Sequence, residues 1–262
     1  MIYLKKIKVK LPLVSKLSLS ALLAITVGFS SFAQTTAKKI TTRPVAWYGY
    51  INSLQLSPKW TLTTDIGERN YIDNGKQAQF LIRSKVNYVL GQNWDAGIGF
   101  AYFETKTFDP ASTSTLGVPE LRPFQEFNNK QKFNKITLSH RYRIEERYFK
   151  KTASDKLIDG YNFNFRFRYM FTFEYNLYKS KDNKKSFGIK AGDEIMVNAG
   201  KNIVNNMFDQ NRLFAAVNYQ PVNNLSFEIG YMNSFQEKSS GTQFNNANIY
   251  RLSIFHKIKL YK

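Results

Sequence analysis

The chain contains no cysteine and only two histidines, His140 and His256, among its 262 residues. Without cysteine it cannot form a disulfide or carry a lipid anchor attached through an N-terminal cysteine. Two histidines leave little material for a metal site or a histidine-based catalytic triad. No glycine-rich phosphate loop is present, and no long apolar run follows the first thirty or so residues. Any membrane crossing must therefore be made by strands.

The first 33 residues have the pattern of a secretory signal peptide. Five lysines, the last of them Lys16, precede a short apolar core at Leu17–Phe29. Small residues then stand at the two positions that a signal peptidase reads, in Ser31-Phe32-Ala33. The core is shorter than the roughly 20 residues of a spanning helix, which disfavours a membrane anchor. We expect a cleaved signal peptide over residues 1–33 and one exported domain over residues 34–262.

The clearest pattern in the remaining chain is the alternation of apolar and polar residues over Tyr161–Leu177. All odd positions are aromatic or leucine, whereas the even positions, apart from Met170, are polar or charged. Period two indicates a strand with one apolar face, because a helix would spread these aromatics around its circumference. Strands of soluble proteins usually have about five or six residues, and about nine to eleven tilted residues cross a bilayer. We interpret this segment as a long strand whose aromatic face contacts lipid.

Strand-like segments fill the rest of the chain and are joined alternately by short turns and longer polar loops. This alternation is typical of an antiparallel up-and-down transmembrane β-barrel with tight periplasmic turns and longer outer loops. The expected strands are Trp47–Leu56, Trp60–Arg69, Ala78–Leu90, Trp94–Phe103, Leu121–Phe127, Lys135–Tyr148, Tyr161–Tyr178, Phe187–Asn198, Phe208–Gln220, Leu225–Gln236 and Asn248–Tyr261. The expected short turns are 57–59, 91–93, 128–132, 179–186 and 221–224, and the expected long loops are 70–77, 104–120, 149–160, 199–207 and 237–247.

Two segments depart from the pattern. Leu121–Phe127 has no clear apolar face, and Asp193 breaks the phase of its strand, which suggests a bulge or a position near the rim.

An even number of strands is expected, about twelve within a range of ten to twelve, as in bacterial outer-membrane barrels. The long loop 237–247 precedes the last strand, so that strand runs inward and the short turn 57–59 is periplasmic. Trp47–Leu56 then starts outside, and an earlier crossing is needed. Only Thr35–Pro44 can supply it, although its alternation is weak. A segment threaded through the lumen is the alternative.

Alternation alone does not say which face is inside, because a soluble barrel with an apolar core has the same period. The number of strands exceeds that of an eight-stranded soluble calyx. Trp47, Trp60 and Trp94 stand at expected strand ends beside short turns, as interface aromatics do. Tyr261 gives the last strand an aromatic end. We therefore expect the apolar face to point outward and the protein to be located in the bacterial outer membrane.

A charged face then points into the barrel. Turning it outward would cost about 2–4 kcal/mol for each Arg or Lys near the midplane. The candidate residues for the lumen wall share the polar parity of their strands and are Arg141, Arg143, Glu145, Arg147, Arg166, Arg168, Glu174, Glu194, Arg212 and Glu228. By the same parity, Asp65, Arg69, Arg83, Lys85 and Arg251 also point inward.

Two functions of this charged face are compatible with the sequence. Most of the charges are expected to pair across the lumen and form a polar core. On the two consecutive strands expected at Lys135–Tyr148 and Tyr161–Tyr178, however, arginines outnumber acids on the polar faces. The arginines are Arg141, Arg143, Arg147, Arg166 and Arg168, and the acids are Glu145 and Glu174. An open lumen would then prefer small anionic solutes. Carboxylates on other strands, such as Glu194 and Glu228, would neutralise this excess and plug the barrel.

Other functional classes find less support. The formal net charge is +19, and +14 remains without residues 1–33, but export and the spread of the basic residues argue against nucleic acid. Ser139 and His140 are adjacent and so point to opposite faces, as do Ser253 and His256. We expect no hydrolytic activity, cofactor or metal, and we expect outer-membrane lipids and the outer-membrane assembly machinery as partners. A lipid- or lipopolysaccharide-modifying enzyme and a structural or adhesion barrel are the alternatives.

Short motifs occur along nearly the whole of residues 34–262. They are Leu138-Ser-His-Arg-Tyr-Arg-Ile-Glu-Glu-Arg147, Arg166-Phe-Arg-Tyr169, Asp193-Glu-Ile-Met-Val-Asn198, Phe208-Asp-Gln-Asn-Arg212, Glu228-Ile-Gly-Tyr231, Leu56-Ser-Pro-Lys-Trp60 and Asn93-Trp94. In these segments the chain resembles the domain of unknown function 2490 family, a group of uncharacterised bacterial outer-membrane barrels. The resemblance implies the fold and the location, and it brings no activity with it.

Overall fold

The computed structural model describes residues 38–182 and 184–261. The regular elements of these residues are all β-strands, and they contain no helix that is long and apolar enough to cross a bilayer. The signal peptide expected at residues 1–33 lies outside the described residues.

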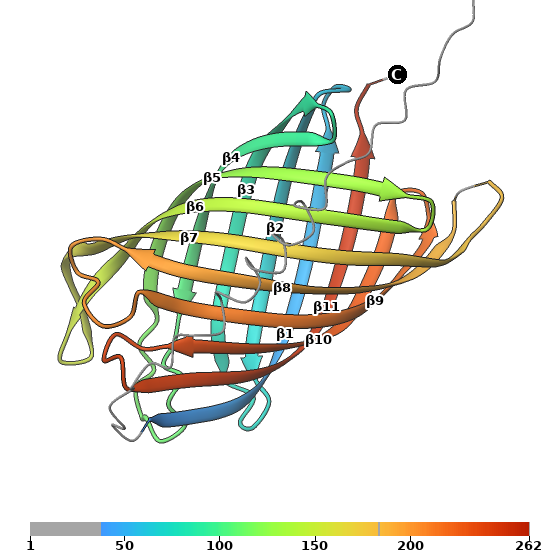
Figure 1. Ribbon diagram of the computed structural model, residues 1–262. Helices are drawn as coiled ribbons and strands as arrows, with labels where there is room; N and C mark the ends of the chain where they lie inside the picture. Colours follow the sequence, from blue (N-terminus) through green and yellow to red (C-terminus); the bar gives the residue numbers. More distant parts are fainter. Residues whose placement is uncertain (1–37, 183, 262) are drawn as a thin grey trace, which may run out of the picture. The chain divides into compact units, whose positions relative to one another are not determined.

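Eleven strands form one closed barrel (Figure 1). They are β1 (Lys39–Gln55), β2 (Trp60–Tyr71), β3 (Gln77–Gly91), β4 (Trp94–Thr105), β5 (Val118–Phe133), β6 (Ile136–Ala153), β7 (Lys156–Lys179), β8 (Ser186–Ala199), β9 (Phe208–Val222), β10 (Leu225–Glu237) and β11 (Gln243–Lys259). Each strand pairs antiparallel with the next. The expected all-β barrel of consecutive antiparallel strands is thus confirmed. In Figure 1 the strands at the front cross those at the back, as the strand tilt of a closed barrel requires.

The barrel closes through a parallel pair between β1 and β11, in register from Lys39 opposite Gln243 to Gln55 opposite Lys259. Strand direction alternates along the chain, so the first and last strands of an odd-numbered barrel point the same way and must pair in parallel. The expectation of an even number, about twelve, is therefore wrong for the described residues, because β1 to β11 already complete the ring. Of the extra crossing expected at 35–44, residues 39–44 belong to β1, and residues 35–37 lie outside the described residues.

All eleven expected strands are present, but one long loop was wrongly expected. Residues 149–160 continue β6 and β7 as a hairpin that turns at Ser154 and Asp155. Both turn residues have positive φ, 48° and 59°, as a two-residue type I′ turn requires. The pairing of β6 with β5 ends at Phe149, and the pairing of β7 with β8 begins at Phe165. From Lys151 to Asn162 the hairpin is exposed on both faces, so the sequence around its turn has no reason to alternate.

The turn expected at 128–132 is wrong for a similar reason. These residues are part of β5, and the chain turns instead after Phe133. Asn134, with φ of 52°, adopts the left-handed conformation there, which asparagine tolerates better than most residues. The polar end of β5 reads as a turn by composition, although it is a strand.

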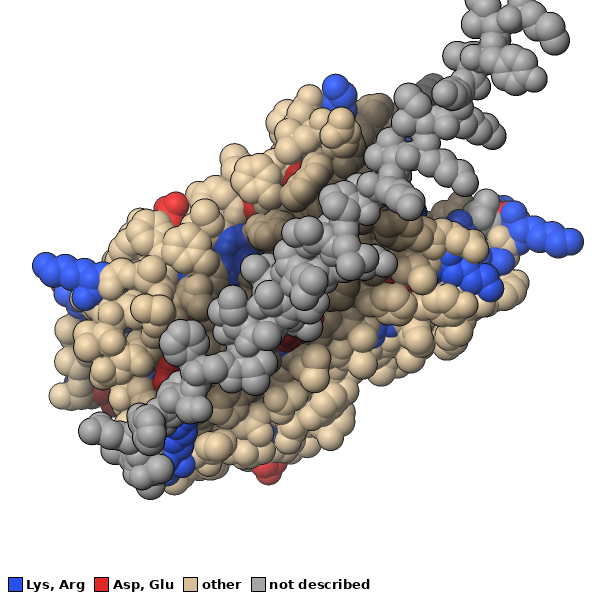
Figure 2. All heavy atoms as spheres, viewed as in Figure 1, with Lys and Arg blue, Asp and Glu red and all other residues tan. Residues whose placement is uncertain are grey.

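In a soluble protein apolar side chains are mostly buried and charged side chains are exposed, whereas in this barrel the arrangement is reversed. On β7, Phe165 and Phe167 are 38% and 41% exposed, whereas the alternating Arg166 and Arg168 are only 3% and 8% exposed. Figure 2 shows one side of the molecule, where most Lys and Arg side chains lie toward the two ends and the visible surface between them belongs mostly to uncharged residues. The barrel therefore has an apolar outer face and a charged inner face.

Of the three tryptophans, two occupy the expected positions. Trp60 and Trp94 begin β2 and β4 and are 46% and 39% exposed. Trp47 was wrongly expected at a strand end, because β1 begins earlier, at Lys39. It packs instead against a buried apolar cluster that includes Val45 and Ile249.

The parallel seam gives a direct test of the strand number. Tyr48 and Leu252 are opposite each other across the seam, and both are exposed on the outer face. We expect the pair Tyr48→Cys and Leu252→Cys to form a disulfide on mild oxidation, because directly paired strand residues have the spacing that a disulfide needs. Non-reducing electrophoresis and peptide mass spectrometry measure the product, without competition from native cysteines.

The matched control is Tyr48→Cys with His256→Cys. His256 lies four residues beyond Leu252 on the same outward face of β11. This pair should not cross-link. Cross-linking of the control in preference to the Tyr48 and Leu252 pair would refute the register of the seam.

Candidate functional site

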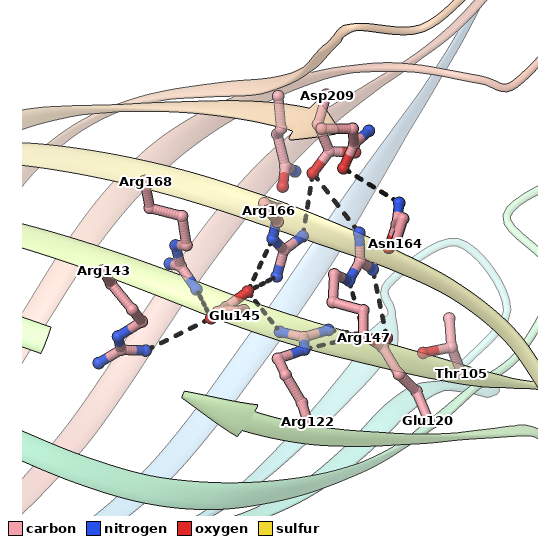
Figure 3. Close-up of polar contacts among 12 residues, drawn as sticks. Thr105, Glu120, Arg122, Arg143, Glu145, Arg147, Asn164, Arg166, Arg168 and Asp209 are labelled. Carbon is pink, nitrogen blue, oxygen red and sulfur yellow. Dashed lines mark hydrogen bonds and ion pairs between the residues drawn. The ribbon is translucent and has the colours of Figure 1, made fainter. Parts of the chain in front are cut away.

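The inner face of the barrel carries a dense group of buried ion pairs, with Glu145 of β6 at its centre (Figure 3). Glu145 is 1% exposed. Its carboxylate accepts hydrogen bonds from Arg166 Nε at 2.7 Å and from Arg168 Nη1 at 2.6 Å. Arg122 and Arg143 bring further guanidinium nitrogens to 3.5 and 3.6 Å. One carboxylate is thus surrounded by four arginines.

The strand register accounts for this arrangement. Glu145 lies directly opposite Arg166, and Arg143 directly opposite Arg168, in the antiparallel pair of β6 and β7. Side chains at alternate positions of a strand share a face, and directly opposite residues have Cβ atoms about 5 Å apart. Inward parity on both strands therefore places Glu145 against Arg166, and it sets the two arginines Arg143 and Arg168 side by side within reach of the Glu145 carboxylate. A shift of one residue would turn every one of these charges to the apolar outer face.

Four further carboxylates extend the group across neighbouring strands. Glu126 accepts from Arg143 Nε at 2.9 Å and pairs with Lys85, and Glu120 accepts from Arg147 Nε at 2.7 Å. Further links join Arg168 to Glu194 at 2.7 Å and Arg166 to Asp209 at 3.0 Å. We call the connected set the main ionic network; it comprises Lys85, Glu120, Arg122, Glu126, Arg141, Arg143, Glu145, Arg147, Arg166, Arg168, Glu194, Asp209 and Arg212.

The fully buried part of this network is balanced in charge. Its five buried arginines are matched by five buried acids, namely Arg122, Arg143, Arg147, Arg166 and Arg168 with Glu120, Glu126, Glu145, Glu194 and Asp209. The remaining members, Lys85, Arg141 and Arg212, are half-buried and share carboxylates with the buried arginines. Pairing of this kind is the condition under which charges are tolerated in a protein interior.

The sequence-derived candidates divide between two groups. Eight of the ten belong to the main ionic network. Glu228 and Glu174 lie apart from it, in a minor ionic network with Lys190 and Arg251. Glu228 is 3.1 Å from Lys190 and 3.2 Å from Arg251, and Lys190 is 4.0 Å from Glu174.

Four buried members were missed from the sequence, namely Glu120, Arg122, Glu126 and Asp209. The first three alternate on β5, but the outward positions of that strand include Pro119, Pro123 and Gln125, so no apolar face marks it as a strand. The regular spacing of Glu120, Arg122, Phe124 and Glu126 was the available signal. Asp209 stands next to the end of a loop and gave none.

The outer face holds both histidines and Asp193. His140 Nδ1 is 2.9 Å from the Tyr169 hydroxyl, and His256 Nδ1 is 3.0 Å from the Tyr50 hydroxyl. Asp193 is exposed and accepts a hydrogen bond from Asn211 Nδ2 at 2.7 Å. It keeps the phase of β8, the register with β7 is unbroken around it, and it lies in the middle of the strand, so the expected bulge or rim position is wrong. The described part of the chain contains no cluster of three acids or histidines suited to hold a metal ion.

The pairing of the buried charges predicts a large effect from the loss of the central acid, Glu145. We expect Glu145→Gln to lower the free energy of unfolding by about 3–5 kcal/mol, because it leaves buried guanidinium groups without a counter-charge. Glu174→Gln is the control, since this acid is 35% exposed in its side chain and has a single pairing at 4.0 Å; it should cost less than about 1 kcal/mol. Urea unfolding of the two variants in lipid vesicles, followed by tryptophan fluorescence, measures the difference. Equal losses would show that the pairing around Glu145 is not specially important.

A comparison with protein families agrees with the sequence motifs. A family model described as "Protein of unknown function (DUF2490)" matches residues 45–245. No curated protein matches the chain. Among solved structures, the chain is similar to one described as "NanC porin structure in rhombohedral crystal form", with 13% sequence identity and a TM-score of 0.49 over 82% of this chain and 99% of that chain. The family match spans most of the barrel and confirms the resemblance found in the sequence: the chain belongs to the DUF2490 family of proteins of unknown function.

Proposed function

We propose that this protein is a bacterial outer-membrane β-barrel whose lumen is closed by the main ionic network. The observation that supports this proposal is that aromatic side chains are exposed on the outside of the barrel, whereas ion pairs are buried inside it. An exposed apolar band around a closed barrel is stable in lipid, whereas in water it would be a large aggregation-prone surface. Outer-membrane lipids and the outer-membrane assembly machinery are the partners that this placement implies.

Closure of the lumen is supported by contacts between strands that are not neighbours. Arg166 of β7 reaches Asp209 of β9. From the other side of the ring, Trp47 of β1 lies 3.7 Å from the Arg69 guanidinium and 5.4 Å from that of Arg212, measured to the ring centre. Long side chains from strands two or three places apart in the ring therefore meet inside the barrel.

The pairing of the arginines with carboxylates argues against an anion channel. Anion selectivity needs cationic side chains that face passing solutes without a neighbouring acid. The five buried arginines of the main ionic network are each paired, and the half-buried Lys85, Arg141 and Arg212 share carboxylates with them. The role of the barrel is therefore performed at its ends or its outer face.

A lipid-modifying enzyme is the weaker alternative. The two histidines contact tyrosine hydroxyls on the outer face, and neither Ser139 nor Ser253 is a hydrogen-bond partner of a histidine among the interactions of the described residues. We infer that the barrel has no hydrolytic activity of its own. A change in lipid profile that is lost when both histidines become alanine would overturn this inference.

The orientation can be tested with single cysteines, because the chain has none of its own. The tip of the β6–β7 hairpin and the β9–β10 turn lie at opposite ends of the barrel. We expect a membrane-impermeant maleimide to label Ser154→Cys on intact cells and to label Asn223→Cys only after permeabilisation. Labelling of both sites on intact cells, or recovery of the protein in the soluble fraction, would contradict the proposed placement.

Closure is tested by conductance. We expect the purified protein to give no discrete openings in planar bilayers, because buried ion pairs fill the lumen. Discrete anion-selective openings that weaken when Arg166 and Arg168 are replaced by glutamine would refute the closed lumen and establish an anion channel.

A further inference from the structure

A cavity of about 690 Å³ opens at the end of the barrel that carries the β6–β7 hairpin. Part of the main ionic network forms its floor, where Arg147 and Asp209 line it (Figure 3). Its walls come from the loop 106–117, the ends of the strands β6 to β11 and the loop 200–207. This volume lies within the range of small-molecule sites in proteins, about 300–1,000 Å³.

Carboxamide groups dominate the polar lining. Seven of the eighteen lining residues are asparagine or glutamine. Each such side chain offers two N–H donors and a carbonyl acceptor, which matches groups that both donate and accept hydrogen bonds. Sugar hydroxyl groups have this dual character, and their number suits a wall of several amides.

One of these amides, that of Asn164, has a buried oxygen without a hydrogen-bond partner among the described residues. Asn164 of β7 is 7% exposed, and its Oδ1 has no hydrogen-bond partner. Its Nδ2 makes only a long contact, 3.4 Å, to Asn198 Oδ1. Asn245 Oδ1, on the opposite wall, is buried and also without a partner. Buried acceptors are nearly always paired, so two unpaired carbonyls in one cavity favour a ligand that donates hydrogen bonds.

The charges at the cavity favour a neutral ligand. Arg147 is already paired with Glu120 at 2.7 Å, and Asp209 with Arg166 at 3.0 Å. The other charged residues of the lining are Asp109, Glu237 and Lys238, so acids outnumber bases around the opening. A phosphate or a polyanion would therefore find no free cationic side chain at the floor and would be repelled at the rim.

Three phenylalanines line the cavity, namely Phe108, Phe149 and Phe163, and contacts with neighbouring side chains position the first two. Phe149 is stacked on the Arg147 guanidinium at 4.3 Å from the ring centre. Phe108 lies edge-on to Tyr71, and its carbonyl accepts a hydrogen bond from Arg43 Nη1 at 3.1 Å. Arg43 is in turn paired with Asp73 at 2.7 Å, and this hydrogen bonding holds the pKa of Asp73 below its usual range. The loop that carries Phe108 is thus tied to the wall, and its ring can pack against the C–H face of a sugar.

We propose that this cavity binds a neutral oligosaccharide of di- or trisaccharide size, held by the amides of Asn164, Asn198 and Asn202 between the aromatic walls. The binding site rests only on the geometry of the barrel end. Its exposure to the medium outside the cell rests on the proposed function.

The test uses the full barrel, purified in a zwitterionic detergent because alkyl glycosides would compete for the cavity. Fluorescently labelled protein is applied to a printed panel of neutral oligosaccharides of glucose, galactose, mannose and N-acetylglucosamine, beside a set of oligouronates. We expect retention on neutral members and not on the oligouronates. Competition by lipopolysaccharide vesicles would identify a surface glycan as the source of the sugar, and its failure a free oligosaccharide.

Variants separate the cavity from other surfaces. We expect Asn164→Leu to weaken binding of the retained sugar about tenfold or more, as the loss of hydrogen bonds at a buried site does. Asn202→Ala, in an exposed loop where folding is not at risk, should weaken it in the same direction. The control Asn223→Ala lies at the other end of the barrel and should leave affinity unchanged.

Three results would overturn the proposal: no retention on any neutral sugar, retention on oligouronates only, or equal affinity of the Asn164→Leu, Asn202→Ala and control proteins. These results are independent of the maleimide test. If the barrel binds sugar but is labelled at both ends on intact cells, the proposed binding site is supported and the proposed orientation is wrong.

Discussion

The structure depends on the pairing of charges inside a barrel whose outside is apolar. Glu145, with four guanidinium groups around it, is the clearest case. An inward-facing arginine cannot be turned outward without meeting the apolar face, and it cannot remain inside without an acid. The inner side chains of β5 to β9 are therefore constrained as a group, and it is the register between neighbouring strands that places each charge near a partner of opposite sign.

Register and strand number are linked through the same constraint. Each antiparallel pair from β5 to β9 places acids and bases within reach, as Glu145 opposite Arg166 illustrates. The ring must then close wherever the first and last strands meet. With eleven strands that meeting is parallel, and the pleat still alternates correctly across the seam, since Tyr48 and Leu252 share the outer face. A barrel with an odd number of strands therefore keeps the same side chains outside on both strands of its seam.

Period two in the sequence was enough to find the strands and the side to which most charges point. It identifies Arg166 and Arg168 because their neighbours on β7 are aromatic, and it misses Glu120 and Arg122 because their neighbours on β5 include two prolines. It cannot give the pairing of Arg166 with Asp209, since these residues lie on strands that are not adjacent. Period two also did not predict the parallel seam, because β1 begins in Lys39–Pro44, where the alternation is weak. Parity is local information, whereas closure and cross-lumen contacts depend on the whole ring.

The location of the main ionic network decides where a ligand could act. Because its buried members are paired with one another, they offer little to a solute that would have to pass between them. At the end of the network, however, Arg147 and Asp209 face a cavity in which amides are the most numerous polar groups. Their ion pairs hold the floor in place, and the hydrogen bond from Asn198 Nδ2 to the carbonyl of Asn206, at 3.2 Å, fixes the loop above it. A floor and wall held in this way are organised before any ligand arrives, and preorganisation of this kind lowers the entropy lost on binding. The same ion pairs that lie inside the barrel therefore also form the floor of this cavity.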